Sequence, residues 1–307
     1  MTLRALAKAF PPDAALTLVD AGSAGGIHRR WRPLAPALIA VGFDPRERSA
    51  SGTLRRGGTR IYPVALGDKA GTARVHITRY AAMSSILFPN RDVLGAFRKK
   101  PEHTEVVESP VVPVDTLDAI AARDGMSPDV LKLDTQGSEC SILDGARNVL
   151  EHSLVATEIE VSFIERYVGQ PLFDDVSARM SAAGFQLIDL VRLKRYRAAN
   201  RSNVRNVSLG LGQRAGTLAH ADAIFVRRDE TLLARAQRDG GLTLLRAIAA
   251  MVAYGKPDIA ARLFDLGEAL LAPKLRAIVA AALRDLSRAR FGLRRLHYYA
   301  DRFARRL

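Results

Sequence analysis

The sequence predicts an α/β fold, a doubly wound and mostly parallel sheet with an inserted pair of strands and a C-terminal helical extension. Three observations support this prediction. Short apolar runs alternate with helix-like segments, most runs end in a polar or glycine-containing turn, and the composition shifts to Ala, Leu and Arg at helical spacing after about residue 231. We expect one domain over residues 1–228 and a basic helical extension over residues 229–307.

The first strand is predicted at residues 16–20, an apolar run that ends in an acid, as in strands buried on both faces. Further strands are expected at residues 37–43 and 60–64. Between the first two strands, Pro33 and Pro36 leave room for only a short or irregular helix, because proline inside a helix costs about 3 kcal/mol.

Residues 72–114 interrupt this alternation. Alternating polar and apolar residues at 72–77 and 106–114 predict the inserted strand pair, with a substrate-side loop at residues 83–90 between them. A capped helix is expected to begin at residue 115, and the last strand is expected at the far side of the sheet. The remaining predicted elements are strands at 130–134, 154–161, 185–190 and 221–226, and helices at 139–150 and 172–183.

The chain is strongly basic. Its 46 Lys and Arg against 32 Asp and Glu leave a formal charge of +14 over 307 residues. Such a charge suits nucleic acid, an anionic membrane surface or an acidic glycan, and it also fits an arginine-rich surface without a specific partner. No RNA-recognition signature or zinc-knuckle spacing is present, so no specific nucleic-acid partner is expected.

The end of the chain carries an apolar stripe at helical spacing, flanked by arginines. A helix of this kind lies on an anionic membrane surface or packs against neighbouring helices, and both interpretations remain open. The stripe consists of Leu286, Ala289, Leu293, Leu296, Ala300, Phe303 and Leu307.

A cytoplasmic location is expected, peripheral to the membrane if the terminal helix binds it. The lone Cys140 excludes an internal disulfide and suits a reducing compartment. The start of the chain, interrupted by Lys8 and stopped by two prolines, is too short for a signal peptide, and no run of about 18 apolar residues predicts a membrane span. The six histidines lack ligand spacing, so no metal is expected.

A glycine turn follows the first strand, with Asp20 at its head and glycines at 22, 25 and 26. The spacing is not G-x-G-x-x-G, which disfavours a nicotinamide-dependent dehydrogenase, and the acid would repel a pyrophosphate. An acid at this position suits a cationic ligand such as S-adenosylmethionine. An ordinary strand and turn, or another nucleotide fold, remain alternatives.

Other acids follow later strands. Asp44 lies 24 positions beyond Asp20, where it could accept both hydroxyls of a ribose. Lys132 and Asp134 share one strand face, where buried charge is costly unless it is paired or faces a cleft. Glu139 also suits the first turn of a helix, and Glu160 lies near the end of the next strand.

Several motifs, in order, resemble those of FkbM-type methyltransferases, which belong to the Rossmann-like S-adenosylmethionine-dependent class. The resemblance covers residues from about 16 to 228, and the K-x-D-x-x-G-x-E element at residues 132–139 is its most specific part. The other motifs are Val19–Gly26, Gly42–Pro45, Ala65–Asp68, Ser84-Ser85, Val114–Asp118, Tyr167–Phe173, Gly184-Phe185 and Ala221–Val226.

The resemblance implies a role for each part of a donor site. Asp20, Gly22 and Gly26 would hold the methionine end of the donor, Asp44 its ribose, and Ala65 with Leu66 its adenine. The chain departs from the family pattern at Asp44, where such proteins usually carry Glu; the shorter acid can still accept ribose hydroxyls.

The leading hypothesis is methyl transfer to a hydroxyl oxygen of a saccharide or related metabolite, without a metal. Asp134 is the candidate base, with Glu139 and Glu160 as alternatives, and we expect these two acids to lie with Ser84 and Ser85 on the acceptor side. The alternative from another class is a non-catalytic scaffold that its basic helical tail recruits to a membrane or a glycan-assembly complex.

Overall fold

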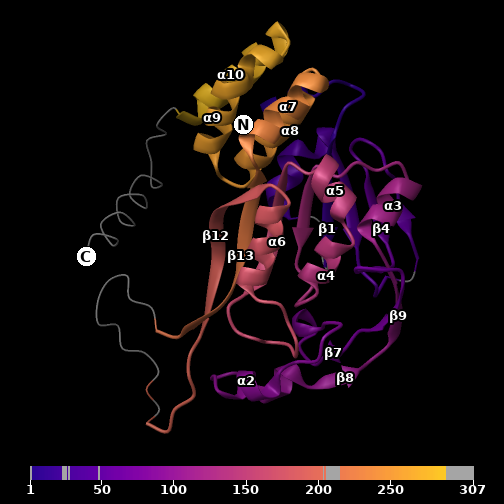
Figure 1. Cartoon of the computed structure of the whole chain (residues 1–307), viewed down its shortest axis with the longest axis vertical. Coiled ribbons are helices and arrows are strands. Elements are labelled where there is room, and N and C mark those ends of the chain that lie inside the picture. The colour runs from indigo at the N-terminus through magenta and orange to yellow at the C-terminus, as the bar shows by residue number, and fades with distance from the viewer. Residues whose placement is uncertain are drawn as a thin grey trace.

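The computed structural model describes residues 2–22, 26, 28–47, 49–202, 204 and 215–287. Within these ranges the chain forms a layered α/β structure around an eight-stranded sheet (Figure 1). The strand order is β12-β13-β11-β10-β1-β2-β4-β3. The predicted fold class, a mostly parallel sheet with helices on both faces, is confirmed. The strands are β1 (Leu16–Ala21), β2 (Leu38–Phe43), β3 (Ser51–Gly52), β4 (Thr59–Tyr62), β10 (Val130–Leu133), β11 (Ala156–Ser162), β12 (Phe185–Tyr196) and β13 (Thr217–Arg227).

Strands β4, β2, β1, β10 and β11 run parallel, whereas β13 is antiparallel to both β11 and β12. The last strand, β13, is therefore the second strand from the edge of the sheet, whereas the sequence predicts it at the far side. The reason is burial: most of β13 is buried on both faces, which suits an interior strand, whereas many β12 side chains, including Gln186 and Lys194, are exposed.

Alternation along the strands divides the apolar side chains between two cores. Val19 and Leu131 belong to the core beneath α3 (Leu117–Arg123), α4 (Glu139–Asp144), α5 (Arg147–His152) and α6 (Phe173–Ala182). Leu18 and Val130 belong to the core on the opposite face.

The C-terminal helices share that second core with the sheet, so the segment expected as an extension packs directly against the strands. Helix α1 and the 3-10 helix η1 complete the layer. The short, irregular η1 confirms the expectation drawn from Pro33 and Pro36. The elements of this layer are α1 (Thr2–Ala9), η1 (Arg29–Ala37), α7 (Asp229–Arg238), α8 (Leu242–Ala253), α9 (Pro257–Gly267), η4 (Glu268–Leu270) and α10 (Pro273–Ser287).

The single helix expected at residues 139–150 is wrong: α4 and α5 are separate. At the break, a Cβ on Gly145 would lie 1.9 Å from the carbonyl oxygen of Gly67, so the chain approaches another loop too closely for a side chain. The carboxylate of Asp118 then accepts the backbone N–H groups of Asn148 and Val149 and starts α5 anew.

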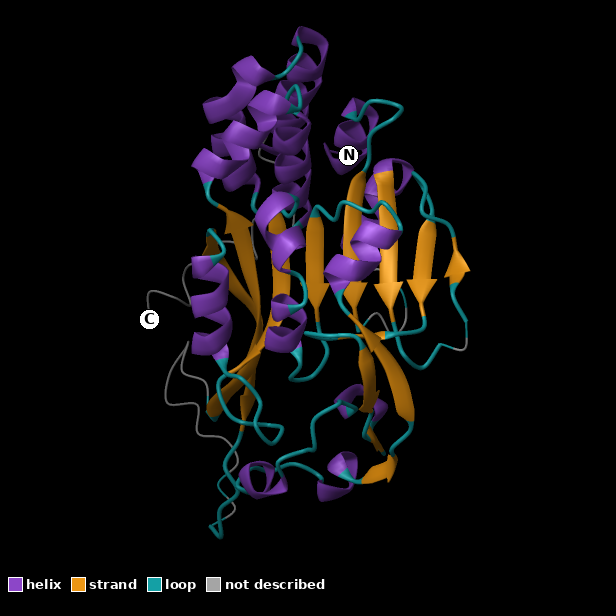
Figure 2. Ribbon diagram, turned by 45° about the vertical axis from the view of Figure 1, so that its right-hand side comes forward, coloured by secondary structure: helices purple, strands orange, loops and turns teal. Residues whose placement is uncertain are grey.

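The residues between β4 and α3 form a small lobe beyond the carboxyl ends of the parallel strands, at the end of the sheet opposite the C-terminal helices (Figure 2). The inserted strands predicted here are present, divided between two sheets, β5-β9-β6 and β7-β8. The lobe contains β5 (Ala65–Leu66), β6 (Gly71–Arg74), β7 (Ile77–Thr78), η2 (Ala81–Met83), α2 (Arg91–Gly95), η3 (Pro101–Thr104), β8 (Val106–Glu108) and β9 (Val111–Asp115).

Two predictions fall outside the described residues: the part of the glycine turn at residues 23–25, and the apolar stripe beyond Leu286. In the portion of the chain that the structure describes, no helix combines the length and apolar character needed to cross a membrane. The same portion holds no group of three or more His, Cys, Asp or Glu side chains arranged to bind a metal ion.

Candidate functional site

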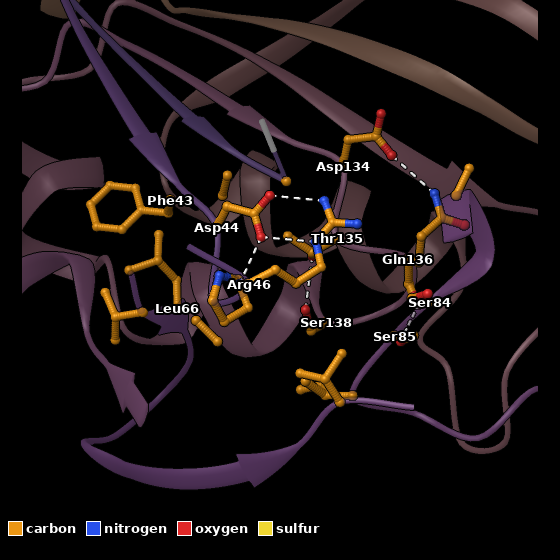
Figure 3. Close-up of a pocket in the computed structure, with 18 of the residues that line it drawn as sticks. Phe43, Asp44, Arg46, Leu66, Ser84, Ser85, Asp134, Thr135, Gln136 and Ser138 are labelled. Atoms are coloured by element: carbon orange, nitrogen blue, oxygen red, sulfur yellow. Dashed lines mark hydrogen bonds and ion pairs between the residues drawn. The ribbon is translucent and has the colours of Figure 1, made fainter. Parts of the chain in front are cut away.

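A cavity of about 370 Å³ lies between the carboxyl ends of β1, β2 and β10 and the lobe (Figure 3). The structure brings together at this cavity residues that are more than 100 positions apart in the sequence. Of the predicted site residues, those that line it are Gly22, Asp44, Ala65, Leu66, Ser84, Ser85 and Asp134. Asp20, Gly26, Glu139 and Glu160 do not line it.

Gly22 lies where the ends of β1, β2 and β10 meet. Its N–H donates to the carbonyl oxygen of Phe43 at 3.2 Å, and a Cβ at this position would lie 2.1 Å from the carbonyl oxygen of Asp134. Its φ of +84° adds a second reason for glycine. Gly26 shares that φ, but nothing lies within 4 Å of its Cβ position, so only the backbone conformation requires glycine there.

Asp20 is buried behind the cavity wall, where its carboxylate binds Lys132 with 2.9 Å between Oδ1 and Nζ. Burial alone would lower the pKa of Lys132, but the carboxylates of Asp20 and Asp134 outweigh it and raise that pKa. Asp20 therefore holds a buried ammonium group beside the cavity and does not face the cavity itself.

Asp44 faces the cavity paired with Arg46 (Figure 3). Its Oδ1 accepts the backbone N–H and Nε–H of Arg46, and its Oδ2 accepts Nη2–H at 2.8 Å. Burial opposes ionisation, but the hydrogen bonds and charge of Arg46 outweigh it and lower the pKa of Asp44. Because a carboxylate oxygen has two lone pairs, Oδ2 keeps one for a further donor.

Asp134 directly follows β10, and 34% of its side chain is exposed. Its backbone N–H donates to the carbonyl oxygen of Ala21, which holds it beside the turn after β1. Its Oδ1 accepts a hydrogen bond from Gln136 Nε2 at 3.0 Å, while its Oδ2 lies 3.8 Å from Lys132 Nζ. Asp134 is thus a partly exposed acid in the cavity wall.

Glu139 is buried in the turn that leads into α4, with its carboxylate turned back onto that turn. It accepts the N–H and hydroxyl of Thr135 and the N–H of Gly137, at 2.9 to 3.2 Å. Burial raises its pKa to about 7. These partners explain why Glu139 closes the turn instead of facing the cavity.

Glu160 is also buried and surrounded by donors. Arg166 Nη2, Gln136 Nε2 and His220 Nδ1 lie 2.7 to 2.9 Å from its oxygens. Burial disfavours the ionised form, but Arg166 and His220 outweigh it and lower the pKa of Glu160 to about 2. Its carboxylate is held inside the protein by these partners.

Of the two serines, Ser85 connects the lobe to the turn after β10, and Ser84 forms a hydrogen bond within the lobe. Ser85 Oγ donates to the carbonyl oxygen of Gln136 at 2.7 Å and accepts the N–H of Leu87. Ser84 Oγ accepts the N–H of Thr78. Ser85 therefore fixes the lobe to the wall of the cavity, whereas the Ser84 side chain stabilises the lobe internally.

Arg46 and Gln136 are among the cavity residues that are absent from the predicted site residues. Each lies two positions after a predicted acid, in the same turn, and this position in the sequence could have identified it as a site residue. Arg166 and Tyr167, which bind the Gln136 side chain, lie more than 20 residues from it, and the sequence carries no signal for that contact. Chemically, the cavity presents two separate carboxylates beside an apolar wall that includes Phe43 and Leu66.

Residues 35–187 match the family model of the Methyltransferase FkbM domain. No curated protein matches the chain. A structure of methyltransferase FkbM from Methylobacillus flagellatus KT is 13% identical, with a TM-score of 0.34 over 70% of this chain, and the match spans 44% of that protein.

Two other solved structures are similar at a lower TM-score. Magnesium protoporphyrin IX methyltransferase from Synechocystis PCC 6803, with bound SAM, is 12% identical over 74% of this chain and 77% of its own, with a TM-score of 0.28. The 16S rRNA (adenine(1408)-N(1))-methyltransferase from Catenulisporales acidiphilia is 18% identical over 74% of this chain and 94% of its own, with a TM-score of 0.27. By its match over residues 35–187, the chain belongs to the FkbM methyltransferase family.

Proposed function

We propose that this protein is an S-adenosylmethionine-dependent methyltransferase that methylates a hydroxyl of a saccharide or related hydroxylated metabolite. The observation that carries the proposal is the meeting of the Gly22 turn, Asp44 and Asp134 at one cavity, in a chain of this family. Ligands of open α/β sheets bind outside the carboxyl ends of the strands, and this cavity lies there.

The residues of the cavity fit this donor. Its volume, about 370 Å³, is within the range of small-molecule sites, and its two acids suit a ligand with positive charge and ribose hydroxyls. Asp44 would accept a ribose hydroxyl through the free lone pair of Oδ2. Ala65, Leu66 and Phe43 would contact the adenine, and the backbone beside Gly22 would contact the methionine end.

When bound, S-adenosylmethionine supplies a methyl group activated by its sulfonium. Asp134 would take the proton of the acceptor hydroxyl as that oxygen receives the methyl group, and the electron pair of the C–S bond would remain with the donor. Alignment of the hydroxyl is the main contribution of the protein to such a displacement. Tyr80 and Phe88, more than half exposed on the lobe, would offer aromatic surface to a sugar ring.

Calorimetric titration with S-adenosylmethionine, followed by transfer of a labelled methyl group to panels of acceptors, tests the proposal. The panels are neutral saccharides, sugar acids, phosphorylated sugars and amines without hydroxyl groups. We expect donor binding and label on a hydroxylated compound. Label on amines alone overturns the O-methylation, and absence of donor binding overturns the methyltransferase and leaves the scaffold alternative.

A further inference from the structure

Gln136 occupies an unusual backbone position in the cavity wall. Its φ is +61°, which costs a residue other than glycine about 1 kcal/mol or more. A strained residue is retained where the surrounding structure holds it in place, and such residues cluster at functional sites.

The side-chain amide of Gln136 uses all of its hydrogen-bonding capacity. Nε2 donates to Asp134 Oδ1 at 3.0 Å and to Glu160 Oε2 at 2.9 Å. Oε1 accepts from Arg166 Nη1 at 3.3 Å and from the Tyr167 hydroxyl at 3.0 Å. The reverse orientation of the amide would face Nε2 toward Arg166, which has no acceptor, so the network determines the orientation.

We propose that Gln136 is a positioning residue, whose amide holds Asp134 by Oδ1 and so leaves Oδ2 to take the proton of the acceptor hydroxyl. The inference rests on the proposed function. Gln136 acts through Asp134 and needs no contact with either substrate. Oδ2 is left available because Lys132 Nζ, at 3.8 Å, lies beyond hydrogen-bond reach of it.

Charge explains why an amide serves here better than an acid. Gln136 bridges two carboxylates, and a glutamate in its place would add a third negative charge between them. Other charges also act on this pair of acids, from every neighbouring element. They are Asp20 on β1, Lys132 on β10, Arg192 on β12, Asp222 and His220 on β13, Glu139 on α4, and Arg166 after β11.

Two substitutions separate the effect of charge at position 136 from the effect of side-chain length. Gln136→Glu keeps the shape and adds a charge, so the acid limb of the pH–rate profile should move to higher pH by about one unit. Gln136→Asn tolerates the left-handed backbone but is one methylene shorter, so kcat should fall about 10²-fold without that pH shift. Gln186→Glu, which makes the same charge change at an exposed position of β12, is the matched control and should leave both readouts unchanged.

The measurements are the S-adenosylmethionine Kd by calorimetry, kcat with the acceptor found in the screen, and the titration of ¹³C-labelled aspartate carboxyls, assigned with Asp134→Asn. The NMR midpoint of Asp134 should move to higher pH in Gln136→Glu and stay with the wild type in Gln186→Glu. Donor Kd should change less than about threefold in every variant, because no hydrogen bond to the donor is removed.

Different results would exclude the positioning role of Gln136 and the proposed function. If the wild-type protein binds no donor, the proposed function is excluded. If the wild type is active and Gln136→Asn keeps its full kcat, the positioning role is excluded. The same holds if Gln136→Glu leaves the NMR midpoint of Asp134 unchanged. A uniform loss of donor binding and thermal stability in both Gln136 variants also overturns the proposal, since it marks a structural residue.

Discussion

Gly22 and Asp134 touch across the ends of β1 and β10, where a Cβ on residue 22 would lie 2.1 Å from the carbonyl oxygen of Asp134. This contact sets the glycine turn directly against the acid proposed as the base. It also makes the shape of the cavity depend on the absence of a single side chain.

Gly22→Ala should therefore lose about 3 kcal/mol of unfolding free energy, from left-handed strain together with overpacking, and should bind S-adenosylmethionine more weakly. Gly26→Ala, with the same φ but open space around it, should lose only about 1 kcal/mol. Urea denaturation of the two variants measures the difference. Equal losses would contradict the importance of the contact.

Asp134→Asn should reduce methyl transfer by about 10²- to 10⁴-fold, the contribution typical of a general base, because an amide cannot take the hydroxyl proton. Donor binding should survive the substitution. Single-turnover kinetics with labelled donor, beside calorimetric titration, measures both quantities. Unchanged turnover would remove Asp134 from the mechanism.

Asp44 and Arg46 should have opposite effects on the donor. Asp44→Ala should weaken S-adenosylmethionine binding by about tenfold or more, because a hydrogen bond to a charged group is lost. Arg46→Ala should tighten it up to about fivefold, because the Arg46 side chain occupies Oδ1, which could otherwise accept the second ribose hydroxyl, and this partly exposed ion pair is worth about 1 kcal/mol at most. Calorimetry checks the sign, and equal weakening in both variants would exclude competition.

Glu160 should contribute stability that depends on pH. Its pKa of about 2 lies below the ordinary 4.5, so its contribution is present above pH 4.5 and is lost as the pH falls toward 2. Glu160→Gln should lose about 3 kcal/mol or more at pH 7, because buried Arg166 loses its charged partner, and less at pH 3. Urea unfolding at the two pH values measures this change.

The matched control for that substitution is Glu105→Gln. Glu105 pairs with Arg79 at the surface, where an ion pair is worth about 1 kcal/mol or less. Its variant should remain close to the wild type at both pH values. A loss for Glu160→Gln that does not diminish with acid would be evidence against the low pKa.

Removal of residues 229–307 should unfold the protein, because buried side chains of α8 such as Leu244 and Ile248 share a core with the sheet. Removal of residues 288–307 retains every described residue of that core and is the better test of membrane recruitment. In sedimentation with vesicles rich in phosphatidylserine, the full chain should pellet with the vesicles and the shorter chain should stay in the supernatant. Equal retention of the two would exclude the terminal stripe as the anchor.

The sequence by itself determined the strand and helix alternation, the irregular η1 and the acids at the strand ends. These properties are local: they follow from apolar runs, from Pro33 and Pro36, and from the glycines of the turns. Even the Gly22 turn, which lies before the family match at residues 35–187, could be recognised from its own residues.

Only the tertiary structure decided which acids face the cavity. Asp134 and Asp44 do, whereas Asp20, Glu139 and Glu160 are turned inward by their partners. The partners of Glu160 show the reason: Arg166 and His220 come from separate segments, and His220 is 60 positions away in the sequence, on β13. The direction of a buried carboxylate depends on where its donors lie, and those positions exist only once the strands have paired.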